Sequence, residues 1–131
     1  MIYRLLQLFG VFLCLIALIH LYNAPLVGLW LKNQLSSNFL KDVGFDFLLN
    51  QLIGILIIPF GISTVYCAAG VKEGRKWAKM IALINAIVLI ILPLMIFILN
   101  GFQYTSNYFL LITDVLMLII GVTMFILLLW L

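Results

Sequence analysis

Residues 70–79 read GVKEGRKWAK and hold four of the seven basic residues of the chain beside a single acid. Long apolar stretches precede and follow this polar segment. The hydrocarbon core of a bilayer is about 30 Å thick, and about 20 apolar residues in a helix cross it. The side of the membrane on which residues 70–79 lie therefore determines the side of every other loop.

Composition restricts the chain to membrane proteins. Its 131 residues are 67% hydrophobic and only 8% charged. Soluble domains carry about 25% charged residues, so these few charges could not cover a water-facing surface. The net charge of +3 suits an anionic lipid leaflet. Nucleic acid would need a denser stripe of Lys and Arg, so the sequence predicts a lipid bilayer and no nucleic acid as partner.

The sequence predicts an all-α polytopic membrane protein with one transmembrane domain over residues 1–131. Its four predicted helices cover about 3–23, 45–69, 77–99 and 107–131. Short loops favour an up-down-up-down bundle, in which the first helix neighbours the second and the fourth. In the first loop, apolar residues recur every four positions, which is typical of a short interfacial helix. An irregular loop is the alternative.

Basic residues predict the orientation of the bundle. Arg4 and residues 70–79 share one side and carry five positive charges, whereas Lys32 and Lys41 lie on the other side. The positive-inside rule then places both termini in the cytoplasm. The residues predicted to bind lipid headgroups are Lys72, Arg75, Lys76, Lys79 and Trp77.

Polar residues of three helices fall at one depth near the outer end. Asp114 lies about two turns inside the fourth helix, roughly 10 Å deep, and His20 about one turn inside the first. Asn50 and Gln51 lie at similar depth on the second. A lipid-facing carboxylate is costly, so Asp114 is predicted to face protein, where pairing with His20 would offset desolvation. The layer is either an outward-opening site for a proton, cation or polar ligand, or a hydrogen-bonded plug that fixes helix register.

A second polar layer lies nearer the cytoplasm, and none of its members is ionisable. These residues, predicted to form interhelical hydrogen bonds, are Ser63, Thr64, Asn85 and Thr123. One histidine and two separated cysteines make no zinc signature. No phosphate-binding, dinucleotide-binding or hydrolase motif is present either. The sequence therefore predicts no metal, no cofactor and no catalytic residue.

Two short motifs resemble known membrane proteins. Gly74–Ala78, GRKWA, precedes a predicted span and resembles the G-[RE]-R-W-A turn of many small prokaryotic four-helix membrane proteins. The stretch from Arg4 to His20, with Gly10 between them, is similar to the first helix of DoxX-like proteins. DoxX-like proteins include small subunits of membrane oxidoreductases, so the resemblance implies an accessory role. It carries over no functional residue.

Three functions fit these features. The first is a non-catalytic accessory or structural subunit of a larger membrane complex, whose partners would be other integral membrane subunits. The scarcity of polar loops and the absence of a catalytic constellation favour it. The second is a small transporter or channel coupled to protons or cations through the outer polar layer. The third is a membrane enzyme on a lipid-soluble substrate, with His20 or Asp114 as acid or base.

Overall fold

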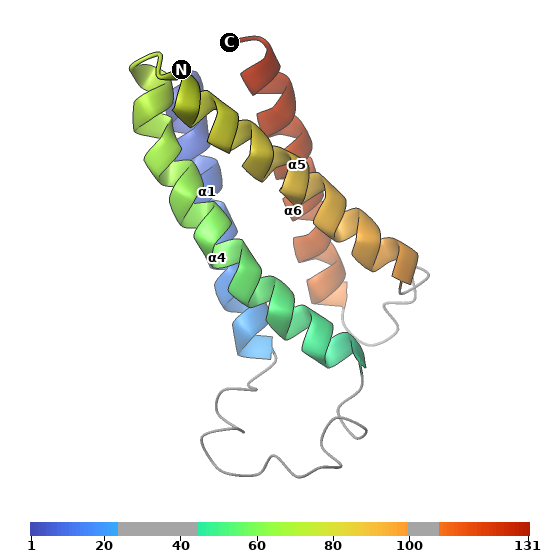
Figure 1. Ribbon diagram of the computed structural model, residues 1–131. Coiled ribbons are helices and arrows are strands. Elements are labelled where there is room, and N and C mark those ends of the chain that lie inside the picture. Colours follow the sequence, from blue (N-terminus) through green and yellow to red (C-terminus); the bar gives the residue numbers. More distant parts are fainter. Residues whose placement is uncertain (24–44, 100–107) are drawn as a thin grey trace.

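The computed structural model describes residues 1–23, 45–99 and 108–131, drawn as coloured ribbons in Figure 1. These residues form helices and no strands: α1 (Ile2–Asn23), α4 (Phe45–Lys72), α5 (Lys76–Leu99) and α6 (Tyr108–Leu129). Each helix contains a stretch that is long and apolar enough to cross a membrane. The chain is therefore an integral membrane protein with a helical bundle, and the predicted fold class is confirmed.

The helices begin and end near their predicted limits. α4 runs on to Lys72, past the predicted end at residue 69, and α6 ends at Leu129, before the last residue. α4 and α5 continue through Pro59 and Pro93, which lie inside them. The interfacial helix predicted for the first loop falls outside the described residues.

The four helices form two hairpins. α1 packs most extensively on α4, and α5 packs most extensively on α6. Contacts between α4 and α5 are fewer, and those between α1 and α6 are fewer still. Both termini and the turn between α4 and α5 lie at one end of the bundle (Figure 1). α1 thus neighbours both α4 and α6, as predicted, but it contacts α4 far more extensively than α6.

Glycines allow the close approach of α1 and α4. A Cβ atom added to Gly10 would lie 2.7 Å from the carbonyl oxygen of Gly61. A Cβ atom added to Gly61 would lie 2.9 Å from the carbonyl oxygen of Gly10 and 2.7 Å from Sγ of Cys14. Helices in lipid associate mainly by such close packing, because apolar burial gives no net drive there. Gly10 and Cys14 of α1 therefore face Gly61 of α4.

The turn between α4 and α5 is a Schellman motif. Gly74 has φ of 72°, in the left-handed region that glycine adopts without a Cβ clash. The N–H of Arg75 donates to the carbonyl of Gly70 at 2.9 Å, and the N–H of Gly74 donates to that of Val71 at 3.1 Å. These two bonds satisfy carbonyls at the end of α4. α5 can therefore begin at once, at Lys76.

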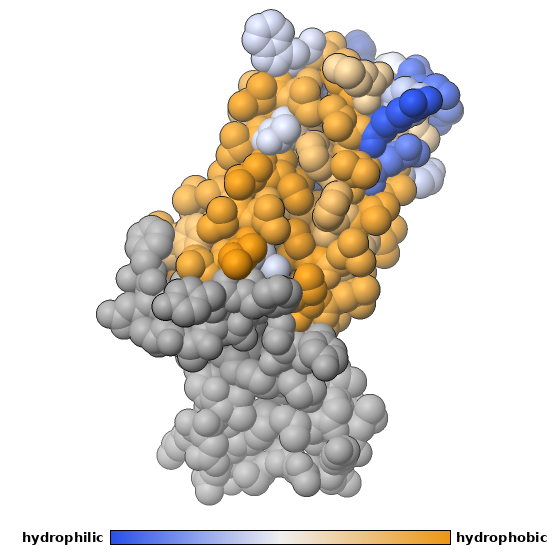
Figure 2. Space-filling model, turned by 180° about the vertical axis from the view of Figure 1, so that it is seen from behind, coloured by the Kyte–Doolittle hydropathy of each residue, from blue (hydrophilic) through white to orange (hydrophobic). Residues whose placement is uncertain are grey.

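Apolar side chains cover the flank of the bundle. In Figure 2, hydrophobic residues fill the described surface, while hydrophilic residues gather at one end, over the α4–α5 turn. Exposed residues along the flank include Phe12, Leu15, Leu18, Ile62 and Ile119. Such a surface is stable against lipid tails and would be costly in water.

Candidate functional site

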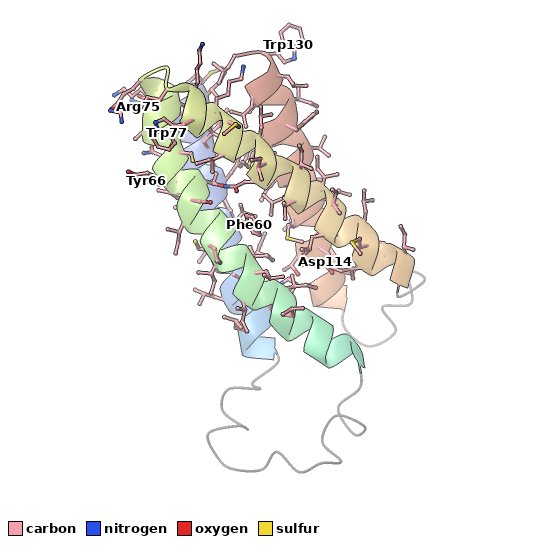
Figure 3. The ribbon with its side chains drawn as sticks, in the orientation of Figure 1. Phe60, Tyr66, Arg75, Trp77, Asp114 and Trp130 are labelled. Atoms are coloured by element: carbon pink, nitrogen blue, oxygen red, sulfur yellow. The ribbon has the colours of Figure 1, made fainter. Side chains whose placement is uncertain are left out.

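The structure brings His20 of α1 and Asp114 of α6 together. Nε2 of His20 lies 3.3 Å from Oδ1 of Asp114, and both side chains are fully buried. Figure 3 shows Asp114 on α6 toward the end of the bundle away from the termini. The carboxylate faces protein, as its cost in lipid predicts.

The second ring nitrogen of His20 is held by its own helix. Nδ1 lies 2.9 Å from the carbonyl oxygen of Ile16, one turn earlier in α1. A carbonyl oxygen only accepts hydrogen bonds, so Nδ1 carries a hydrogen and donates it. This bond orients the ring and directs Nε2 toward Asp114.

One proton is therefore shared between His20 and Asp114. Since Nδ1 is protonated, two arrangements give a hydrogen bond between Nε2 and Oδ1. In one, an imidazolium donates to a carboxylate; in the other, a carboxylic acid donates to a neutral imidazole. Both arrangements hold one proton in the gap and have zero net charge. Zero net charge is the state that a site of low dielectric constant favours.

Gly54 of α4 leaves room for this pair. A Cβ atom at Gly54 would lie 3.1 Å from Cβ of His20 and 3.2 Å from the carbonyl oxygen of Ala17. A side chain at this position would press against Cβ of His20, so α4 packs closely against the histidine. The sequence alone assigned Gly54 no role in the site. Its depth, similar to that of His20, can be counted from the sequence, but its contact with the histidine cannot.

The other two members of the predicted outer layer lie on α4. Asn50 and Gln51 fall within the helix, but their side chains lie outside the described part of the structure. Their predicted participation in a proton or ligand site stays a prediction.

Asn85 of α5 joins α4 in the second polar layer. Its Nδ2 donates to Oγ of Ser63 at 2.7 Å and to Oγ1 of Thr64 at 3.1 Å. Both hydroxyls donate in turn to the carbonyl of Phe60, at 3.2 and 2.7 Å. The three side chains thus form an interhelical network that ends on a backbone carbonyl directly after Pro59.

Thr123 does not belong to this network in the described structure. Its Oγ1 donates to the carbonyl of Ile119 in its own helix, at 2.7 Å. A threonine hydroxyl in a helix competes for the carbonyl one turn earlier, and here that local bond is formed. The depth of Thr123 in the sequence predicted a hydrogen bond to another helix. In the structure, its hydroxyl instead bonds within α6.

The residues predicted to bind headgroups lie around the α4–α5 turn. Arg75 and Trp77 mark this end in Figure 3. The ring of Trp77 packs on that of Tyr66, with centroids 6.0 Å apart. Nε of Arg75 forms an exposed ion pair with Glu73 at 2.6 Å, and Nζ of Lys72 lies 5.2 Å from the ring centroid of Tyr3.

Metal-ligating side chains do not cluster in the part of the chain that the structure describes. Every buried polar side-chain atom described there has a hydrogen-bond partner.

Comparisons with protein-family models, with curated proteins and with solved structures find no match for this chain. The resemblance to DoxX-like proteins accordingly stays a hypothesis that rests on the two short motifs.

Proposed function

We propose that the chain is a non-catalytic structural subunit of a larger integral membrane complex, in which the His20–Asp114 pair locks its two hairpins together. The observation that supports this function is the complete burial of both side chains. A side chain with no accessible surface borders no void large enough for water. Each group is also held inside the chain, since His20 bonds both Asp114 and a backbone carbonyl.

The location of the pair suits a lock. It lies between α1 and α6, which contact each other far less than α1 contacts α4 or α5 contacts α6. Helices in lipid gain little from apolar burial, so a hydrogen bond between them, worth about 0.6–1.7 kcal/mol, adds noticeably to a small contact. The pair thus helps to align the α1–α4 hairpin with the α5–α6 hairpin.

The proposed complex is a membrane oxidoreductase of a prokaryotic cell membrane, with both chain ends of this subunit in the cytoplasm. The DoxX-like motifs favour that class of complex, and the five positive charges at the end bearing the termini favour that orientation. No cofactor of its own is required for this role.

Native purification tests the proposal. The tagged chain is extracted in mild detergent and analysed by native mass spectrometry. We expect other membrane chains to accompany it, giving a mass well above the 14.9 kDa of one copy. Migration as a lone monomer, with no accompanying chain, would contradict the proposal.

Proton- or cation-coupled transport is the second candidate, and the shared proton of the buried pair favours it. Two ionisable groups on different helices could pass a proton if the bundle opened. Asp114→Asn should then abolish pH-dependent flux in liposomes, because an amide cannot release a proton at ordinary pH. Unchanged flux in this variant, or no flux in the parent protein, would remove this candidate.

The membrane-enzyme hypothesis needs a cavity lined by both side chains, whereas both are fully enclosed.

A further inference from the structure

A basic cavity lies at the end of the bundle that carries the termini. Its volume is about 320 Å³, at the lower limit of the roughly 300–1,000 Å³ typical of small-ligand pockets. It lies between the α4–α5 turn and the C-terminal end of the described chain. The residues that line it are Val71, Gly74, Arg75, Lys76, Lys79 and Leu131.

The charged side chains that line the cavity are all positive. Three of the lining side chains are cationic and none is acidic. Arg75 already pairs with Glu73, which lies in the same turn. Within the described residues, no side-chain carboxylate lies within ion-pair distance of Lys76 or Lys79. These two ammonium groups, one turn apart on α5, are therefore the cations available to an anion.

The position of the cavity places it at the depth of lipid headgroups. It begins where the apolar span of α4 ends, at Lys72, and where that of α5 begins. Trp77 and Trp130 lie at this end (Figure 3), and tryptophan is enriched at the interface between membrane and water. Hydrophilic side chains gather there as well (Figure 2). Val71 and Leu131 add apolar walls that suit a glycerol or acyl segment better than a free ion.

We propose that this cavity binds the headgroup of one anionic phospholipid. The ammonium groups of Lys76 and Lys79 hold the phosphate, while Val71 and Leu131 contact the start of the acyl chains. The combination of paired cations, apolar walls and headgroup depth distinguishes this site from a general attraction to an anionic leaflet. The proposal is independent of the function proposed above.

Native mass spectrometry of the full chain, with any subunits that remain bound, tests the site. Phosphatidylglycerol, phosphatidylcholine or glycerol 3-phosphate is added in separate titrations. We expect one phosphatidylglycerol to bind before any further copies, and more tightly than phosphatidylcholine. The Lys76→Gln/Lys79→Gln variant should bind this first lipid at least about tenfold more weakly, because each ammonium group donates a charge-assisted hydrogen bond to the phosphate.

The matched control is Arg4→Gln, compared with Lys76→Gln or Lys79→Gln alone, because it removes one positive charge at the same end but outside the cavity. We expect its first-lipid affinity to change by less than about threefold, because separated surface charges are screened. Lys76→Arg/Lys79→Arg should retain binding. Equal losses in the single-lysine variants and the control would overturn the proposal in favour of diffuse attraction. Equal binding of phosphatidylcholine, or comparable binding of glycerol 3-phosphate, would overturn the lipid assignment.

Discussion

At the scale of single residues, one backbone carbonyl determines that Nδ1 of His20 carries a hydrogen. The backbone carbonyl of Ile16 accepts the hydrogen on Nδ1. A hydrogen bond between His20 and Asp114 therefore needs a proton on Nε2 or on the carboxyl group. Removing that proton would leave two lone pairs facing each other beside a buried negative charge. Adding a second would leave a buried positive charge. A hydrogen between Nε2 and Oδ1 therefore joins the two side chains, whichever atom carries it.

Substitution of Asp114 separates a structural role from a proton-carrying one. In Asp114→Asn, the amide N–H can donate to Nε2 of neutral His20, so we expect stability to fall by less than about 1 kcal/mol. Asp114→Leu leaves Nε2 buried without a donor and should cost about 1–3 kcal/mol. Unfolding by sodium dodecyl sulfate in mixed micelles, followed by circular dichroism, measures both variants. Equal losses in the two variants would contradict the lock.

A double variant provides a second check on the same pair. In His20→Phe/Asp114→Leu, both members of the buried pair are removed and Nε2 is no longer left without its partner, so we expect it to be more stable than Asp114→Leu alone. Replacement of both members of a buried pair by apolar groups is often neutral. Additive losses from the two substitutions, measured by the same unfolding assay, would indicate that the side chains do not interact.

Asn85 and Thr123 should respond differently to loss of their polar groups. Asn85→Ala removes both hydrogen bonds to α4, and we expect it to reduce stability by about 0.6–1.7 kcal/mol. Thr123→Val removes only a bond inside α6, so its effect should be near zero. Detergent unfolding gives both values. A larger loss in Thr123→Val than in Asn85→Ala would contradict the assigned network.

At the scale of elements, α1 and α4 form the closest pair because backbone meets backbone. Gly10→Ala would place a methyl group 2.7 Å from the Gly61 carbonyl, which a rigid backbone cannot avoid without a helix shift. We expect a loss of about 1–3 kcal/mol, as for overpacking in other tightly packed interiors. Gly54→Ala, whose nearest atoms lie at 3.1–3.2 Å, should cost less. Thermal melts in detergent rank the two, and the reverse order would contradict this packing.

The α4–α5 turn depends on glycine for a different reason. Nothing lies within 4 Å of a Cβ atom at Gly74, so the constraint there is the positive φ. We expect Gly74→Ala to cost roughly 1 kcal/mol through backbone strain. Gly74→Asn should recover much of that loss, because asparagine tolerates the left-handed region. Thermal melts of both variants test this, and equal losses would indicate that strain at φ is not the cause.

At the scale of the whole molecule, both termini should lie on one face of the membrane with the α4–α5 turn. The four candidate spans within the described residues bring the chain back to its starting face, and five positive charges at that end favour the cytoplasm. Epitope tags at each end, with protease protection in inverted vesicles, give the measurement. Tags on opposite faces would contradict four spans. Tags together on the outer face would contradict only the orientation.

The sequence by itself determined the class and number of the spans. Hydropathy is a property of each segment alone, so 20 or more apolar residues predict a span in almost any tertiary context. The same holds for the turn at Gly74, whose chemistry is local. The cost of a carboxylate in lipid also predicted an inward-facing Asp114, because that penalty exists for any arrangement of neighbours.

Only the tertiary structure decided which polar groups meet. Depth along a helix can be counted from the sequence, but the rotation of each helix about its axis depends on packing with the others. Thus His20 reaches Asp114, and Asn85 reaches Ser63 and Thr64, whereas Thr123 at a similar depth bonds within α6. The close packing of Gly54 against His20 was likewise hidden, because close approach is a relation between two backbones. In a nearly uniformly apolar sequence, the residues around each helix differ little, so the sequence does not show which face of the helix points inward. Only the packed bundle shows that rotation.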